Sequence, residues 1–132
     1  MKTVLSLLCL TVLAVFTVQA GENAVKEISH ADLQKAISDG KVLLIDVNGS
    51  ESYKQGHIPG AIDFQSKKDD LAKHLPKDKG ALVVAYCGNE HCGAYMRGAK
   101  AALDLGYTNV AHYKPGIAGW IASKGEIEKP KS

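Results

Sequence analysis

The hydrophobic positions of this chain follow two patterns, continuous apolar runs and helical spacing, which alternate along the sequence. Mainly apolar runs at residues 42–47, 81–86 and 109–113 predict strands, and the first two predict strands buried on both faces. Segments with helical features lie around them, at residues 30–38, 51–55, 66–74 and 94–105 and after Pro115. Ser29, with Asp32 three residues further on, predicts a capping box at the start of the first of these helices. Strands that alternate with helices indicate βαβ units, so we expect an α/β domain with a parallel sheet.

The first twenty residues form a segment of a different kind. Fourteen of them are apolar, and Lys2 carries the only charge. The apolar stretch at 4–18 is shorter than the roughly 20 residues that span a bilayer. It leads into Val18-Gln19-Ala20, which has small residues where a signal peptidase cleaves. This pattern predicts a secretory signal peptide over residues 1–20. We therefore expect a periplasmic or secreted protein with a single domain over residues 21–132 and no membrane segment after cleavage.

Composition narrows the class of protein. Hydrophobic residues make up 45% of the chain and charged residues 23%, which excludes a disordered or low-complexity chain. The net charge of +2 gives no support to a nucleic-acid binder. Of the three cysteines, Cys9 belongs to the predicted signal peptide. Cys87 and Cys92 therefore remain, in a compartment where thiols tend to oxidise.

Cys87 follows directly on the predicted buried strand at 81–86, where parallel sheets place their functional sites. The residues after it are Gly88, Asn89, Glu90, His91, Cys92 and Gly93, and a predicted helix begins next. The two glycines allow the loop to curl so that its amide groups point inward, and the helix adds the positive end of its dipole. Such a loop lowers the pKa of a central thiol and holds an anionic substrate, so we predict a nucleophilic Cys87 in a substrate-binding loop.

Four segments of the chain resemble the rhodanese-like domain, a family of sulfurtransferases. They are the strand at 43–47, which resembles LIDV, the Y-x-x-GHIPGA stretch at 53–61, the strand and cysteine at 83–87, and the segments at 106–110 and 115–120, which resemble GY-x-NV and GGI-x-x-W. The resemblance implies a central parallel sheet with helices on both faces. It also implies that Cys87 accepts a sulfane sulfur as a persulfide from a small donor such as thiosulfate and then delivers it to a thiol acceptor. No metal or organic cofactor is implied.

The active-site loop departs from the common pattern of this family. It lacks the usual arginine after the cysteine, and it resembles the family branch whose loop reads Cys-x4-Cys. Arg97, the only arginine in the chain, falls one turn into the following helix and is a candidate substitute that contacts substrate. Asp46, at the end of the strand at 42–47, is predicted to support the site through hydrogen bonds to loop backbone.

Several roles stay open for the residues of this loop. Cys92 is suited to resolve a Cys87 persulfide, to form a disulfide with Cys87, or to cap the helix as a small apolar residue. His91 is either a pKa partner for Cys87 or a solvated histidine, whereas Glu90 is expected to face solvent. A metal site is not predicted, because a fourth ligand is missing nearby.

Three functions are therefore compared. The first is an exported sulfurtransferase acting through Cys87, with a small sulfur donor, a thiol acceptor and a potential protein partner. The second is a thiol–disulfide redox protein that uses Cys87 and Cys92. The third is a non-catalytic binding module that keeps the fold without the loop chemistry.

Overall fold

The computed structural model describes residues 25–131, so the predicted signal peptide at 1–20 lies outside the described part of the chain. Five parallel strands form one sheet with the order β1-β5-β4-β2-β3. The strands are β1 (Lys26–Glu27), β2 (Leu43–Asp46), β3 (Ile62–Asp63), β4 (Val83–Tyr86) and β5 (Val110–His112). The predicted α/β class and parallel sheet are confirmed, and β4 lies at the centre of the sheet.

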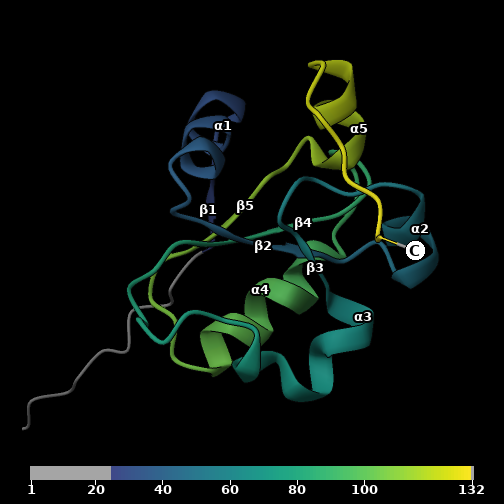
Figure 1. The fold of residues 1–132 in the computed structure, drawn as a ribbon. Coiled ribbons are helices and arrows are strands. Elements are labelled where there is room, and N and C mark those ends of the chain that lie inside the picture. Colours follow the sequence, from purple (N-terminus) through teal and green to yellow (C-terminus); the bar gives the residue numbers. More distant parts are fainter. Residues whose placement is uncertain (1–24, 132) are drawn as a thin grey trace, which may run out of the picture.

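Helices cover both faces of this sheet, as the resemblance implied (Figure 1). One face carries α1 (His30–Ser38) and α5 (Gly116–Ala122), and the other carries α3 (Phe64–Lys67) and α4 (Tyr95–Asp104). The helix α2 (Ser50–Gln55) follows β2, and a 3-10 helix η1 (Lys68–Lys73) follows α3.

Side chains of the central strand divide the core into two halves. Val83 and Ala85 pack with the α4 side, whereas Val84 and Tyr86 pack with the side of α1 and α5. All four are fully buried. The continuous apolar run therefore reflects a strand that is covered on both faces, as predicted.

Most predicted elements are present, with differences where the pattern is short. The helix α1 begins after Ser29, whose hydroxyl accepts a hydrogen bond of 3.1 Å from the amide of Asp32, and this is the predicted N-cap. The edge strands β1 and β3 were not predicted, because two residues are too few to show a period. The single helix expected at 66–74 is instead two short helices, with non-helical dihedral angles at Asp70.

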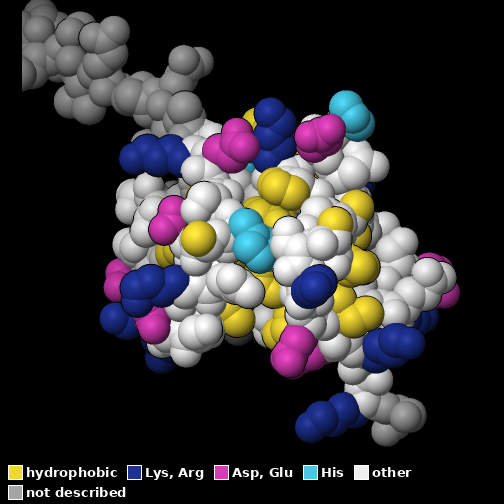
Figure 2. Space-filling view, turned by 90° about the horizontal axis from the view of Figure 1, so that it is seen from above, with side chains coloured by type: hydrophobic (Ala, Val, Ile, Leu, Met, Phe, Trp, Pro, Cys, Tyr) yellow, Lys and Arg dark blue, Asp and Glu magenta, His cyan; other side chains and the backbone are white. Residues whose placement is uncertain are grey.

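The surface over α1 and α5 mixes apolar and charged side chains. Figure 2 looks onto this face, where hydrophobic side chains gather near the middle and charged ones lie mostly toward the rim. Ile121 on α5 and Ile127 beyond it are 53% and 42% exposed. Among residues 25–131, no helix is long and apolar enough to cross a membrane.

Candidate active site

The pairing of β2 with β4 brings the predicted site residues to one edge of the sheet. Asp46 and Tyr86, the last residues of these strands, are register partners. Cys87 follows Tyr86 and is only 3% exposed, so its side chain is held between the sheet edge and the loop that follows. The loop at 88–94 then leads into α4.

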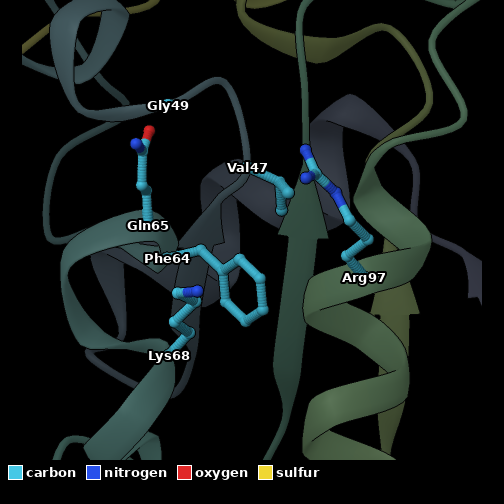
Figure 3. Close-up of a pocket in the computed structure, with 6 residues that line it drawn as sticks. All are labelled: Val47, Gly49, Phe64, Gln65, Lys68 and Arg97. Carbon is cyan, nitrogen blue, oxygen red and sulfur yellow. The ribbon is translucent and has the colours of Figure 1, made fainter.

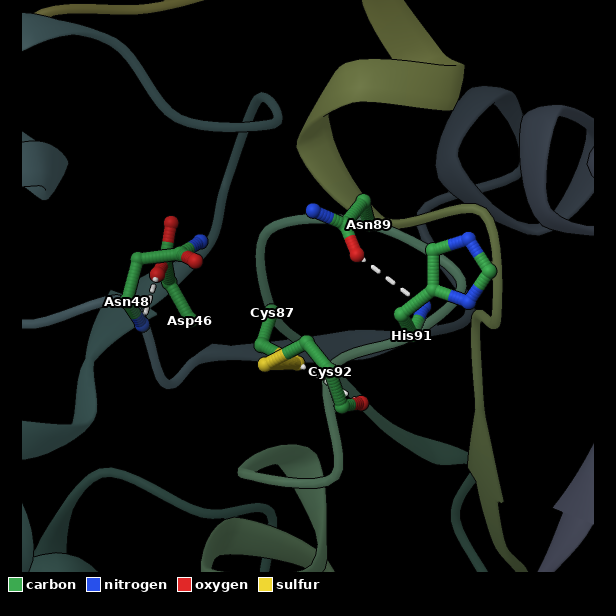
Figure 4. The surroundings of a disulfide bond; sticks show 6 residues. All are labelled: Asp46, Asn48, Cys87, Asn89, His91 and Cys92. Atoms are coloured by element: carbon green, nitrogen blue, oxygen red, sulfur yellow. Dashed lines mark hydrogen bonds between the residues drawn. A yellow bond between two sulfur atoms is a disulfide. The ribbon is translucent and has the colours of Figure 1, made fainter.

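Cys87 and Cys92 form a disulfide, with their Cα atoms 6.3 Å apart (Figure 4). Of the roles left open for Cys92, the structure therefore contains the disulfide. The carbonyl oxygen of Cys92 also lies 3.1 Å from the sulfur of Cys87. Cys92 is partly exposed, so the two sulfur-bearing residues differ in their contact with solvent.

Asn89 organises the turn between the two cysteines. Its side-chain oxygen accepts a hydrogen bond of 3.0 Å from the amide of His91, and its carbonyl accepts one of 3.1 Å from the amide of Cys92. The amides of His91 and Cys92 therefore donate to Asn89 within the turn. The sequence led us to expect loop amides that point at the sulfur of Cys87, and these two amides do not. An asparagine at this position favours such a turn because its side chain mimics a backbone acceptor.

The loop is also fastened to α5. The carbonyl oxygens of Cys87 and Gly88 accept hydrogen bonds of 2.9 and 3.0 Å from the amides of Ile117 and Ala118, in the first turn of that helix. Gly116 makes this approach feasible. Its φ is +63°, and a Cβ atom there would lie 2.5 Å from the carbonyl oxygen of Cys87.

A buried polar group supports the cysteine from below. Tyr86 donates a hydrogen bond of 2.7 Å to the carboxylate of Asp46 and accepts one of 3.0 Å from the amide of Ile58. The other carboxylate oxygen of Asp46 accepts a bond of 2.8 Å from the amide of Asn48. Asp46 therefore makes the hydrogen bond to backbone after β2 that the sequence led us to expect, and its supporting role in the site stays a prediction.

Burial dominates the electrostatics of this group. It raises the pKa of Asp46, against the opposing effect of the hydrogen bonds from Asn48 and Tyr86. It also raises the pKa of Tyr86 far above its ordinary value, and the adjacent Asp46 carboxylate adds to that shift. The Tyr86 hydroxyl therefore keeps its proton at neutral pH and donates a hydrogen bond to Asp46.

Glu90 and His91 lie on the outer side of the loop. Their side chains are 64% and 87% exposed, and 3.4 Å separates the closest ring nitrogen and carboxylate oxygen. The imidazole of His91 points away from the disulfide (Figure 4). In this arrangement His91 is a solvated histidine and Glu90 faces solvent.

Arg97 lines a cavity that is separate from the cysteine loop. The cavity measures about 290 Å³, and Val47, Gly49, Phe64, Gln65 and Lys68 complete its lining (Figure 3). Residues 87–93 do not line it. The contact of Arg97 with substrate stays a prediction. Val47, which also lines this cavity, lies beside Tyr86 through a backbone hydrogen bond of 3.0 Å.

Sequence reasoning missed three residues around the loop. Gly116 had a signal, since the Pro115-Gly116 pair marks a turn, but its contact with Cys87 depends on tertiary packing. Tyr95 and His112 stack with ring centroids 4.1 Å apart, and nothing in the sequence relates them. Within residues 25–131, no cluster of three or more His, Cys, Asp or Glu residues is arranged to hold a metal ion.

Comparison with known families agrees with this geometry. The family described as the rhodanese-like domain matches residues 29–123, which include the strands β2 to β5 and the whole cysteine loop. The chain belongs to this family. The rhodanese fold therefore accounts for the central parallel sheet with helices around it.

Similar rhodanese-like sequences occur in proteins with different names. An HTH-type transcriptional regulator of Mycobacterium tuberculosis is 33% identical over 94 residues, which are 70% of this chain and 40% of the regulator. A tRNA uridine(34) hydroxylase of Buchnera aphidicola is 31% identical over 102 residues, 71% of this chain and 31% of the hydroxylase. The chain thus spans less than half the length of these relatives.

Solved structures share the fold at lower identity. A human single-domain sulfurtransferase superimposes with a TM-score of 0.59 at 21% identity, covering 74% of this chain and 96% of the human one. This likeness concerns the fold.

Proposed function

We propose that this rhodanese-like domain is a sulfurtransferase that carries sulfane sulfur as a persulfide on Cys87. The observation that carries the proposal is the position of Cys87. It follows the buried central strand, it is almost inaccessible, and hydrogen bonds to α5 fix its backbone. A nucleophile held this rigidly loses little freedom when it meets its substrate.

The proposed reaction has two steps and starts from the reduced cysteine. The Cys87 thiolate attacks the outer sulfur of a donor such as thiosulfate, a sulfur–sulfur bond forms, and sulfite leaves with the electron pair of the broken bond. An acceptor thiolate then attacks the outer sulfur of the Cys87 persulfide. The Cys87 thiolate leaves, and the acceptor carries the sulfane sulfur away.

Mass spectrometry of the protein without residues 1–20 tests this proposal. The protein is reduced, freed of reductant and treated with thiosulfate or with a polysulfide. We expect a mass gain of one sulfur that maps to Cys87 in the wild type and in Cys92→Ser, and no gain in Cys87→Ser. If neither donor adds sulfur to Cys87, the sulfurtransferase proposal fails and a binding module becomes the better account.

The disulfide favours a second candidate, a thiol–disulfide redox protein that uses both cysteines. Its central prediction is that Cys92→Ser abolishes turnover with a dithiol substrate, since the single thiol of that variant cannot form the disulfide. Sulfur transfer through Cys87 alone predicts the opposite, because Cys92→Ser keeps its nucleophile. The same variant therefore separates the two candidates.

We also propose that the chain is exported and that residues 1–20 are removed. The support comes from the sequence, in which a single lysine precedes an apolar stretch that ends near Ala20. Expression of the full chain in a bacterium, followed by fractionation and N-terminal sequencing, tests the proposal. A mature protein that starts at Gly21 outside the cytoplasm is expected, and an intact Met1 in the cytoplasm contradicts it.

A further inference from the structure

The two sides of the cysteine loop face different surroundings. A groove of about 360 Å³ opens next to Cys92, and Glu90, His91 and Gly93 contribute to its rim. Tyr95, His112, Lys114 and Glu27 complete the lining. Cys92 lines this groove, whereas Cys87 does not. A molecule bound in the groove therefore meets the Cys92 end of the disulfide first.

The groove has a rigid wall. Tyr95, at the start of α4, stacks on His112 of β5 with an interplanar angle of 11°. His112 in turn is the register partner of Glu27 on β1. Burial lowers the pKa of His112, and the nearby Lys114 lowers it as well, while Glu27 opposes the shift. The wall is thus a flat, uncharged surface near neutral pH, and the same groove holds the carboxylates of Glu27 and Glu90 and the ammonium group of Lys114.

Attack on a disulfide is directional. The incoming thiolate approaches one sulfur along the axis of the sulfur–sulfur bond, from the side opposite the other sulfur. Cys87 is 3% exposed, and the partial negative charge of the Cys92 carbonyl lies 3.1 Å from its sulfur. In the disulfide form, an anionic nucleophile is therefore hindered from reaching the sulfur of Cys87 by burial and repelled from it by the Cys92 carbonyl. Cys92 is partly exposed and faces the groove.

We infer that the groove beside Cys92 is the binding site for a small thiol that opens the disulfide by attack on Cys92. The inference rests on the proposed function in one respect, because opening the disulfide produces the reduced Cys87 that sulfur transfer needs. Lys114 and Glu27 offer a partner to each charge of a zwitterionic thiol, so the ligand class is an amino-acid or small-peptide thiol. The flat face of the Tyr95–His112 stack accommodates its apolar part.

The chemical balance involves two molecules of the small thiol. The first thiolate forms a bond to the sulfur of Cys92, the Cys87–Cys92 bond breaks, and its electron pair leaves on Cys87 as a thiolate. A second thiolate takes the first from Cys92, so that the Cys92 thiolate leaves. The two small thiols are oxidised to one disulfide, and the two cysteines are reduced.

The position of the mixed disulfide tests the inference. The oxidised protein receives a brief pulse of L-cysteine, the reaction is quenched with acid, free thiols are alkylated, and the peptide that contains both cysteines is fragmented. We expect the cysteine adduct on Cys92 and the alkyl group on Cys87. An adduct on Cys87 with an alkylated Cys92 overturns the inference. This result does not depend on whether Cys87 ever accepts sulfane sulfur, so it is distinct from a failure of the proposed function.

Rates test the role of the groove itself. Lys114→Ala and Glu27→Gln are each expected to slow reduction by L-cysteine by about 2- to 5-fold, the effect of an exposed charge pair. Reduction by 2-mercaptoethanol, which has no charge besides its thiolate, is expected to slow less. Lys100→Ala, on the exposed side of α4, serves as the matched control and should alter neither rate. Equal slowing of both thiols by the groove variants contradicts the assignment of a zwitterionic ligand.

Discussion

The cysteine loop lies between two regions with opposite character. Beneath it, Asp46, Tyr86 and the amide of Ile58 form a group, here called the floor, in which each polar atom has a partner and solvent is nearly absent. On its outer side, Glu90 and His91 form the rim, where both side chains are well exposed. Tyr86 of the floor and Glu90 of the rim are only four residues apart in sequence, yet the two regions differ in almost every physical respect.

The comparison shows how this domain holds a reactive group. The floor fixes Tyr86, the residue before Cys87, through buried hydrogen bonds that are expensive to break, because a lost partner leaves a polar group without water. The rim contributes little to stability, since exposed ion pairs gain little from each other in water. The backbone at Cys87 is therefore held by the floor through Tyr86 and by the hydrogen bond from α5, whereas the rim contributes little to its position.

The largest effect is expected where α5 meets the loop, as an extension of the floor. Gly116→Ala should lower the free energy of unfolding by about 2–4 kcal/mol, because it adds backbone strain and a clash with the carbonyl of Cys87. Gly40→Ala is the matched control. Gly40 has a similar φ of +64° but no atom within 4 Å of its would-be Cβ, so it should lose only about 1 kcal/mol. Urea denaturation compares the two, and equal losses would show that the contact with Cys87 is unimportant.

The next effect concerns the floor. Tyr86→Phe removes the hydroxyl that serves Asp46 and Ile58, so we expect a loss of about 1–3 kcal/mol in the free energy of unfolding. Tyr95→Phe is the control. The hydroxyl of Tyr95 has no hydrogen bond within the described residues, and its removal should change stability by less than about 0.5 kcal/mol. If both variants behave alike in thermal and urea denaturation, the floor does not have the strength assigned to it.

A smaller effect is expected from pH. Because the pKa of Asp46 is raised in the folded state, the folded protein binds this proton more tightly than the unfolded chain. The contribution of Asp46 is therefore fully present below the unfolded pKa of about 3.9 and is lost as the pH rises through the folded pKa. The stability of the wild type relative to Asp46→Asn should fall across that window, by no more than about 1.4 kcal/mol per pH unit. A difference that rises with pH there would contradict the raised pKa.

The smallest effect belongs to the rim. Glu90→Gln and His91→Ala should each change the free energy of unfolding by less than about 0.5 kcal/mol. Alkylation of the reduced Cys87 by iodoacetamide, followed as a function of pH, should also keep its midpoint, because the imidazole of His91 points away from the cysteines. A clear shift of that midpoint in His91→Ala would show that His91 reaches the sulfur in the reduced protein, and the contrast between rim and floor would then be weaker.

The sequence predicted the elements whose pattern is long or chemically marked. The buried strand before Cys87 was evident from its apolar run, and α1 was evident from Ser29 and the spacing after it. The strands β1 and β3 were not predictable, because two residues gain their structure from a neighbouring strand rather than from a pattern of their own.

The sequence predicted which residues belong to the site but not the contacts that they make with other elements. Cys87, Cys92 and Asp46 were identified from their places at strand ends and in the loop. The stack of Tyr95 on His112 joins residues of separate elements, and the cavity around Arg97 depends on how α3 packs beside β2. Such contacts follow from tertiary packing, which a single sequence does not encode in a readable local pattern.

The hydrogen bonds from α5 to the cysteine loop have a consequence for how the chain matures. Ile117 follows Cys87 by 30 residues, so synthesis produces both cysteines well before the helix that fastens their backbone. Until that helix docks, the carbonyls of Cys87 and Gly88 lack their final partners and both thiols are open to oxidants. The Cys87–Cys92 pair is only five residues apart, so closing this ring costs little chain entropy and does not require α5. The disulfide can therefore form before α5 docks, and the docked helix then fixes the backbone of a ring that is already closed.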